Sequence, residues 1–398
     1  MRFRTTLILA VLLAGLGAYL YFVEFERLAE EAKKKTLLEF KTEDVVAITL
    51  TYPDRKIALK FTDGKWRLVE PVHDLADETT VTNLLRAIAE CEIKKTLEDV
   101  PSDLAPFGLD KPGAEIHVAL TERELPVIKV GKTTPVGFST YIQRADDPKV
   151  HLTSSAFHSG TDKQVKDLRD KQIVKFEDSD IRTIALHGVD HDILLVKTDT
   201  SWSLEQPATY AADAATVRSF LSTLRSMRAT DFAAEEAADL APFGLAQPRL
   251  TITLTPDKED EQKRILVGSE NDKKDLYVKV AARPTIYVVG SWVFRDLNKT
   301  ANDFRDKTVV AFDPEAVTTV TVERGDGERF TLTRGENRVW ALEGSETAPE
   351  ESVVTRFLDD LKDLKAHEIA SDTAEDLAPY GLASPQLRVA VGGTDGTV

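Results

Sequence analysis

One seven-residue string occurs three times in the chain, and this repetition constrains the fold more than any other feature. The string reads Asp-Leu-Ala-Pro-Phe-Gly-Leu in the first two copies, and Tyr replaces Phe in the third. The copies begin at positions 103, 239 and 376, so the interval between them is almost constant. Repetition at the length of a domain predicts a tandem array of one folding unit. The positions that define this repeat signature are Asp103, Pro106, Phe107, Gly108 and Leu109, then Asp239, Pro242, Phe243, Gly244 and Leu245, then Asp376, Pro379, Tyr380, Gly381 and Leu382.

The residue types in the string predict a corner between a helix and a strand. Asp103 can cap a short helical turn, and Pro106 tolerates the first turn of a helix. Gly108 can adopt the left-handed conformation that ends such a turn. Leu109 then returns to the core. We therefore expect the string to build the fold and not to bind a ligand.

A tryptophan recurs in the third strand predicted for each copy, at Trp66, Trp202 and Trp340. A large aromatic residue that keeps its register is most simply a core residue. A tryptophan that stacks on a ligand is the alternative.

A helix is predicted between that strand and the string, because apolar residues recur there with helical spacing. The second and third copies fill the place of Cys91 with Met227 and Leu364, so we interpret the single cysteine as a buried apolar residue and not as a nucleophile. The apolar face consists of Val81, Leu84, Leu85, Ile88 and Cys91 in the first copy, of Val217, Phe220, Leu221, Leu224 and Met227 in the second, and of Val354, Phe357, Leu358, Leu361 and Leu364 in the third.

The pattern as a whole predicts an α+β fold, with an N-terminal transmembrane helix followed by tandem repeats of a β-β-β-α-β-β-β-β-α unit with mainly antiparallel sheet. We expect an anchor at 1–23, a juxtamembrane helix or stalk at 24–39, and repeats at 40–175, 176–311 and 312–398. The third repeat is incomplete, either as a genuine half-domain or because the reading frame is truncated.

The anchor is assigned to Leu7–Val23, a run of 17 residues without charge. Arg2 and Arg4 precede the run and Glu24 follows it, which predicts a cytoplasmic N-terminus and repeats in the periplasm, at the inner membrane of a bacterium. A cleaved signal peptide is the alternative, but its apolar core would be shorter, and Gly15-Leu16-Gly17 is a poor cleavage site.

Composition and motifs exclude several function classes. A formal net charge of −16 argues against nucleic acid as a partner. His187 and His191 flank a predicted turn, and the acidic run at Asp257–Glu261 lies on a predicted hairpin tip, so neither predicts a metal site. We expect no catalytic residue, no cofactor and no metal.

The string, the strand that begins Asp-Gly-x-Trp and the distance between them resemble a bacterial envelope family known as domain of unknown function 4340. The resemblance covers both full copies and the start of the third. It implies a protein with a single anchor, often encoded beside subunits of ATP-binding-cassette (ABC) transporters. No catalytic residues are defined for that family.

These observations favour a membrane-anchored, extracytoplasmic, non-enzymatic scaffold or accessory protein, of an ABC-type envelope transporter system. Its partners would be the membrane, through Leu7–Val23, and transporter subunits or other envelope proteins. The first alternative is a binding module for an envelope polymer or ligand. The second is an enzyme of unrecognised type.

Overall fold

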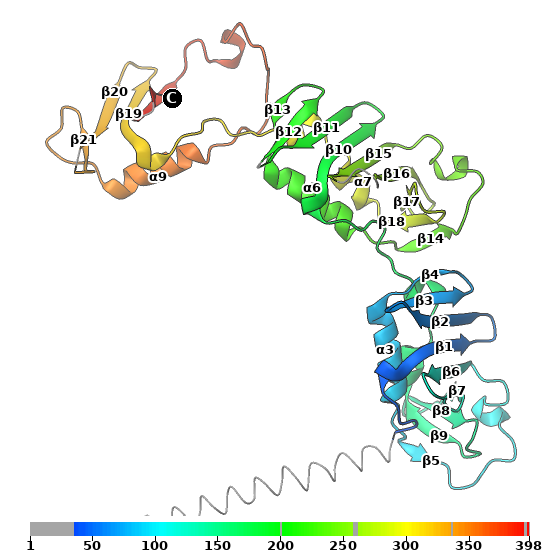
Figure 1. Cartoon of the computed structure of the whole chain (residues 1–398). Coiled ribbons are helices and arrows are strands. Elements are labelled where there is room, and N and C mark those ends of the chain that lie inside the picture. Colours follow the sequence, from blue (N-terminus) through cyan, green and yellow to red (C-terminus); the bar gives the residue numbers. More distant parts are fainter. Residues whose placement is uncertain (1–35, 200, 258–261, 336, 394–395, 398) are drawn as a thin grey trace, which may run out of the picture. The chain divides into compact units, whose positions relative to one another are not determined.

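The computed structural model describes residues 36–199, 201–257, 262–335, 337–393 and 396–397. These residues form three sheets whose strands pair in antiparallel fashion, and each sheet carries helices of its own repeat (Figure 1).

The sheet of the first repeat has the strand order β4-β3-β2-β1-β6-β7-β8-β9-β5. The string follows the strand β5, which comes after the helix α3, and leads to the strand β6 through a short 3-10 turn, η3 (Ala105–Phe107). The strands are β1 (Val45–Thr51), β2 (Lys56–Thr62), β3 (Lys65–Glu70), β4 (Asp74–Leu75), β5 (Lys95–Thr96), β6 (Ala114–Leu120), β7 (Ile128–Thr133), β8 (Ser139–Arg144) and β9 (His151–Ser154); a 3-10 turn, η2 (Thr42–Asp44), precedes them, and the helices are α3 (Glu78–Ala89), α4 (Ser155–Thr161) and α5 (Val165–Leu168).

The second repeat follows the same plan, with the order β13-β12-β11-β10-β15-β16-β17-β18-β14. Its elements are η4 (Asp178–Asp180), β10 (Ile181–Gly188), β11 (Asp192–Lys197), β12 (Trp202–Gln206), β13 (Tyr210–Ala211), α6 (Ala214–Ser226), β14 (Asp231–Ala234), η5 (Ala241–Phe243), β15 (Leu250–Pro256), β16 (Lys263–Glu270), β17 (Leu276–Val280), β18 (Ile286–Val289), α7 (Trp292–Leu297) and α8 (Ala301–Phe304).

The third sheet has five strands, in the order β21-β20-β19-β22-β23. Its elements are η6 (Pro314–Ala316), β19 (Val317–Arg324), β20 (Arg329–Arg334), β21 (Trp340–Leu342), α9 (Glu351–Lys362), η7 (Ala378–Tyr380), β22 (Leu387–Gly393) and β23 (Gly396–Thr397).

Two compact units divide the chain. The first contains the described residues up to Gln172 together with Ala229–Glu235, and the second contains Ile173–Arg228 and the described residues from Glu236 onwards. The segment Ala229–Glu235, which follows the helix of the second repeat, is thus part of the first unit.

The helix α3 illustrates how the sequence builds each core. Asp77 caps the helix by accepting a hydrogen bond from the backbone N–H of Thr80 (2.9 Å). The apolar face of the helix is buried, and burial of this face against the sheet stabilises the helix more than its intrinsic propensity does. The buried helix residues are Val81, Leu84, Leu85 and Ile88.

The predicted fold class was wrong. It placed a transmembrane helix before the repeats, but no helix among the described residues is long and apolar enough to cross a membrane. The run to which that helix was assigned, Leu7–Val23, lies outside the described residues.

The predicted repeat unit also differs from the observed one. The first repeat has additional strands of two residues, β4 and β5, which are too short to show the alternation that identifies a strand. Two short helices replace the single last helix, because Gln164 and Asp167 form a capping box that starts α5 after α4 has ended.

Candidate functional site

The repeated string forms the same corner in all three repeats. Asp103 Oδ1 accepts a hydrogen bond from the backbone N–H of Ala105 (2.9 Å), and Gly108 ends the turn in the left-handed conformation with φ of 66°. The equivalent bonds from Ala241 to Asp239 and from Ala378 to Asp376 have the same length, and Gly244 and Gly381 are also left-handed. The Asp and Gly of the string therefore hold the backbone turn.

The last leucine of the string is buried in two repeats and exposed in the third. Leu109 is 1% exposed and Leu245 is 3% exposed, whereas Leu382 is 56% exposed. In the first two repeats a later strand, β7 or β16, covers this leucine. In the third repeat the strand at that place in the sheet is β23, whose two described residues pair with Gly392 and Gly393 at the far end of β22.

A glycine in the covering strand allows the close approach. A Cβ atom at Gly131 would lie 2.3 Å from the carbonyl oxygen of Phe107, and one at Gly268 would lie 2.1 Å from that of Phe243. Any side chain at these positions would push the strand away from the corner. The sequence-based reasoning missed both glycines, although the interval between them equals the interval between the second and third copies of the string.

The aromatic residue of the string also has a packing partner in the first and second repeats. The ring of Phe107 lies edge-on to that of Tyr141 with centroids 5.0 Å apart, and Phe243 and Tyr277 form the equivalent pair at 5.0 Å. Such edge-to-face pairs stabilise a core beyond the area they bury. In the third repeat Tyr380 is 46% exposed.

The three predicted tryptophans lie in β3, β12 and β21. Trp66 and Trp340 are buried, and Trp202 is half-buried. Trp66 contacts the ring of Phe61 with centroids 5.5 Å apart. This burial fits core residues better than side chains that stack on a ligand.

A buried arginine ties the end of the first repeat to the segment Ala229–Glu235 of the first unit. Arg169 is 2% exposed; its Nη2 lies 2.7 Å from Asp74 Oδ2 and its Nη1 lies 2.5 Å from Glu235 Oε1. The guanidinium also stacks on Phe232, 3.6 Å from the ring centroid. Two carboxylates and an aromatic face together compensate the loss of water around this cation.

The second unit contains an equivalent joint. Arg305 Nη2 lies 2.6 Å from Asp372 Oδ1, and the guanidinium stacks on Tyr210 at 3.6 Å. Tyr210 donates a hydrogen bond to Asp372 (2.8 Å). The hydrogen bond from Arg305, followed by that from Tyr210, lowers the pKa of Asp372. The interval from Arg169 to Arg305 equals that between the first two copies of the string, so the joint recurs with the repeat.

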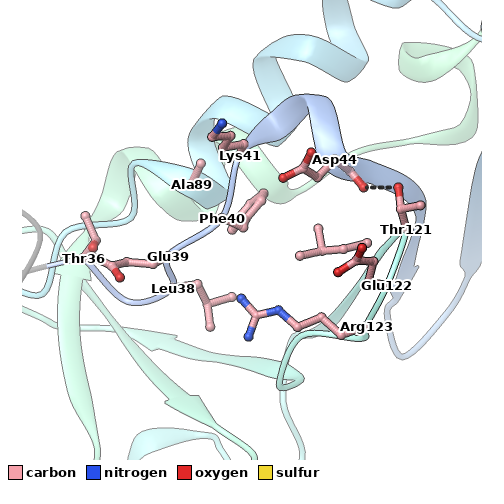
Figure 2. A pocket seen from close by; sticks show the side chains of 11 residues that line it. Thr36, Leu38, Glu39, Phe40, Lys41, Asp44, Ala89, Thr121, Glu122 and Arg123 are labelled. Carbon is pink, nitrogen blue, oxygen red and sulfur yellow. Dashed lines mark hydrogen bonds between the residues drawn. The ribbon is translucent and has the colours of Figure 1, made fainter.

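The first unit has a cavity of about 890 Å³ where the described chain enters the first repeat. Figure 2 shows Leu38, Phe40 and the long side chain of Arg123 around this hollow. The Oγ1 atom of Thr121 donates a hydrogen bond to the carbonyl oxygen of Asp44 (3.3 Å) at its edge. The remaining lining residues are Thr36, Glu39, Lys41, Ala89, Leu120 and Glu122.

Most charged side chains that line this cavity form no ion pair with another described residue. Within the described part of the chain, the guanidinium of Arg123 has no ion-pair partner, while Lys41 pairs with Glu43 outside the cavity at 3.7 Å. An apolar floor with free cationic and anionic groups can hold an amphiphilic molecule in a fixed orientation.

The first of the two predicted turns is the hairpin between β10 and β11. His187 pairs with Asp192 across the hairpin between β10 and β11, and no group of three potential metal-ligating side chains occurs among the residues that the structure describes. Most of the acidic run at Asp257–Glu261 lies outside the described residues.

Comparison with known proteins gives one match. The family model for a domain of unknown function, DUF4340, matches residues 66–203 and 202–385. The match thus consists of two tandem copies, where the strings predicted three repeats. Neither a curated protein nor a solved structure matches the chain. Because the two matched stretches cover most of its 398 residues, the chain belongs to the DUF4340 family.

Proposed function

We propose that this chain is a non-enzymatic scaffold or accessory protein that acts outside the cytoplasm, at the inner membrane, for an ABC-type envelope transporter. The recurring arginine joint is the observation that carries this proposal. Arg169 and Arg305 each connect one repeat to the segment that follows the helix of the next. A joint that recurs with the repeat indicates that the tandem copies are built on one plan, and repeated copies of one unit suit the assembly of partner proteins.

The test is recovery of transporter subunits with the full chain. An affinity-tagged chain is crosslinked in native membranes, purified and analysed by mass spectrometry. We expect ABC transporter subunits to be enriched with the parent chain and depleted with the double variant Arg169→Gln, Arg305→Gln. Arg182→Gln, which removes an exposed pair with Asp257 and a hydrogen bond to the carbonyl of Lys197, is the matched control. Recovery of no transporter subunit with the parent chain would contradict the proposal.

The proposed location rests on the sequence, in which Arg2 and Arg4 precede the uncharged run at Leu7–Val23. Protease added to intact spheroplasts tests it directly. We expect digestion of the repeats before the cells are lysed. Protection of the repeats until lysis would place them in the cytoplasm and contradict the proposal.

A second candidate function is a binding module for an envelope polymer or amphiphilic ligand, and the cavity beside Arg123 favours it. Retention of the full chain on purified peptidoglycan or envelope polysaccharide would support this function. We expect Arg123→Glu to abolish retention and Arg67→Glu, on the exposed side of β3, to leave it unchanged. Equal retention of the two variants would exclude the cavity as the site.

A further inference from the structure

The hairpin between β7 and β8 presents two apolar side chains to solvent. Val136 is 87% exposed and Phe138 is 78% exposed. They lie in an uncharged stretch of sequence that runs from Thr133 to Gln143. Single exposed apolar residues are common on protein surfaces, but two at the tip of one turn, with no charge beside them, form a protruding apolar point.

Hydrogen bonds within the turn fix this exposure. The backbone N–H of Thr134 donates to the carbonyl of Ser139 (2.7 Å), and Thr134 Oγ1 donates to the carbonyl of Val136 (2.8 Å). The N–H of Ser155, at the start of α4, donates to the carbonyl of Phe138 (3.0 Å). The tip is therefore organised to hold its apolar side chains outward before it meets a partner.

The second repeat provides an internal comparison, because its hairpin between β16 and β17 is closed by an equivalent hydrogen bond, with a turn that is one residue shorter. The N–H of Asn271 donates to the carbonyl of Asp275 (2.7 Å), as Thr134 does to Ser139. The residue near the end of each turn has positive φ, 45° at Phe138 and 68° at Lys274. The closing hydrogen bond and a residue with positive φ thus occur in both turns, whereas the two exposed apolar side chains occur in the first of them only.

Phe138 is an energetically unfavourable residue for this left-handed position. Bulky residues seldom adopt positive φ, and a lysine such as Lys274 can at least keep its charge in water. Phe138 combines the unfavourable backbone conformation with an exposed ring. The turn of the second repeat, which contains Asp272, Lys273 and Lys274, has no comparable apolar residue.

We propose that this tip inserts Val136 and Phe138 into the interfacial region of a lipid bilayer. A bilayer accommodates a convex point without a matching pocket, and an uncharged turn loses little hydration on entering it. The net charge of −16 disfavours anionic lipid, so zwitterionic lipid is the expected surface. In the sequence, the repeat with the apolar tip is also the one that follows the uncharged run at Leu7–Val23. The inference is independent of the scaffold role.

An environment-sensitive fluorophore on the full chain tests the insertion. Val136→Cys carries the probe at the tip of the first repeat, and Asp272→Cys carries it at the equivalent place in the second. The native Cys91 is buried, and burial raises its pKa to about 11, so labelling at neutral pH is directed to the introduced cysteine. The probe is measured with phosphatidylcholine vesicles, with and without a spin-labelled lipid that quenches it.

We expect the probe at position 136 to shift to shorter wavelength and to be quenched by the spin-labelled lipid, and the probe at position 272 to do neither. Adding Phe138→Asp to the Val136→Cys chain should weaken tip insertion by about 10- to 100-fold, which corresponds to losing the burial of one aromatic side chain. Circular dichroism of this variant checks that the exposed substitution leaves the fold unchanged.

Two results would overturn the proposal. The first is no lipid-dependent change at position 136, and a protein crosslink that depends on Phe138 would then assign the tip to a protein pocket. The second is an equal change at positions 136 and 272, which would mean that the chain adsorbs to vesicles without using this tip.

Discussion

Replacing the last leucine of the string by alanine tests whether its contribution to stability depends on its burial or only on its place in the string. Leu245 and Leu382 occupy identical positions in the string, but the first is 3% exposed and the second is 56% exposed. We predict that Leu245→Ala strongly destabilises the second repeat and that Leu382→Ala leaves the free energy of unfolding almost unchanged.

The burial determines the magnitude. Leu→Ala removes three carbon atoms, and at about 0.8 kcal/mol for each buried methylene the transfer term is about 2.4 kcal/mol. The side chain of Leu245 packs under Gly268, in a place that cannot collapse freely, so a cavity term raises the loss to about 3–5 kcal/mol. The same substitution at the exposed Leu382 should change stability by less than about 0.5 kcal/mol.

Urea unfolding of the full chain, followed by circular dichroism of the sheets, measures this difference. With a urea dependence of about 2 kcal/mol per molar, a loss of about 3 kcal/mol lowers the midpoint of the affected transition by about 1.5 M. Leu109→Ala should behave like Leu245→Ala, because Leu109 is 1% exposed.

Equal shifts of the urea midpoint for Leu245→Ala and Leu382→Ala would refute this reasoning, since burial under Gly268 of β16 would then not be the source of the stabilisation. An unchanged midpoint for Leu245→Ala would refute it as well. If Leu382→Ala alone were destabilising, another part of the molecule would have to cover the corner of the third repeat.

Three further predictions concern the glycine, the arginine and the cysteine. Gly268→Val should prevent the close approach to Phe243 and lower the melting temperature. Gly64→Val has no atom within 4 Å of the added Cβ, so it should cause only the smaller loss that comes from its left-handed backbone. Calorimetry measures both melting temperatures, and similar losses would contradict the role of the close contact. Arg169→Gln should destabilise the first unit by about 1–3 kcal/mol, less than the loss of a fully buried pair would, because Asp74 and Glu235 remain partly in water. Faster hydrogen exchange at the N–H of Ala229, which donates to the carbonyl of Lys171, would report this loss. Unchanged exchange would argue against the joint. Because burial raises the pKa of Cys91 to about 11, the native thiol should react with iodoacetamide at pH 8 about 100-fold more slowly than an exposed thiol. The stability that the neutral thiol contributes should be complete below pH 9 and should decrease as the pH rises from about 9 to 11. Rapid alkylation of the folded chain would contradict the burial.

The sequence was sufficient where the signal is local and periodic. The apolar spacing of Val81, Leu84 and Ile88 predicts a helical face, and all three side chains are buried in α3. The residue types of the string likewise predict its turn, since a capping carboxylate and a left-handed glycine act within a few residues of each other. The comparison between repeats added the place of Cys91, which is buried just after the helix.

The remaining features depend on contacts that sequence spacing does not display. Arg169 and Glu235 are 66 residues apart, and nothing near either residue indicates that they meet. Gly131 lies in β7 and contacts Leu109, which follows the turn η3, so the role of the glycine becomes visible only in the folded structure. The short strands β4 and β5 exist because neighbouring strands position them, with too few residues to produce a pattern of their own.

Hydrogen exchange in the unmodified chain tests most directly whether the string is a structural corner held by the strand that covers it. The N–H groups of Leu109, Leu245 and Leu382 each donate to the carbonyl of the first leucine of the same string, at 3.2, 3.1 and 3.0 Å. Because the local hydrogen bonds are alike, differences in exchange must come from the packing around them. We predict that Leu109 and Leu245 exchange about 100-fold or more slowly than Leu382. Equal protection at all three leucines would contradict the account.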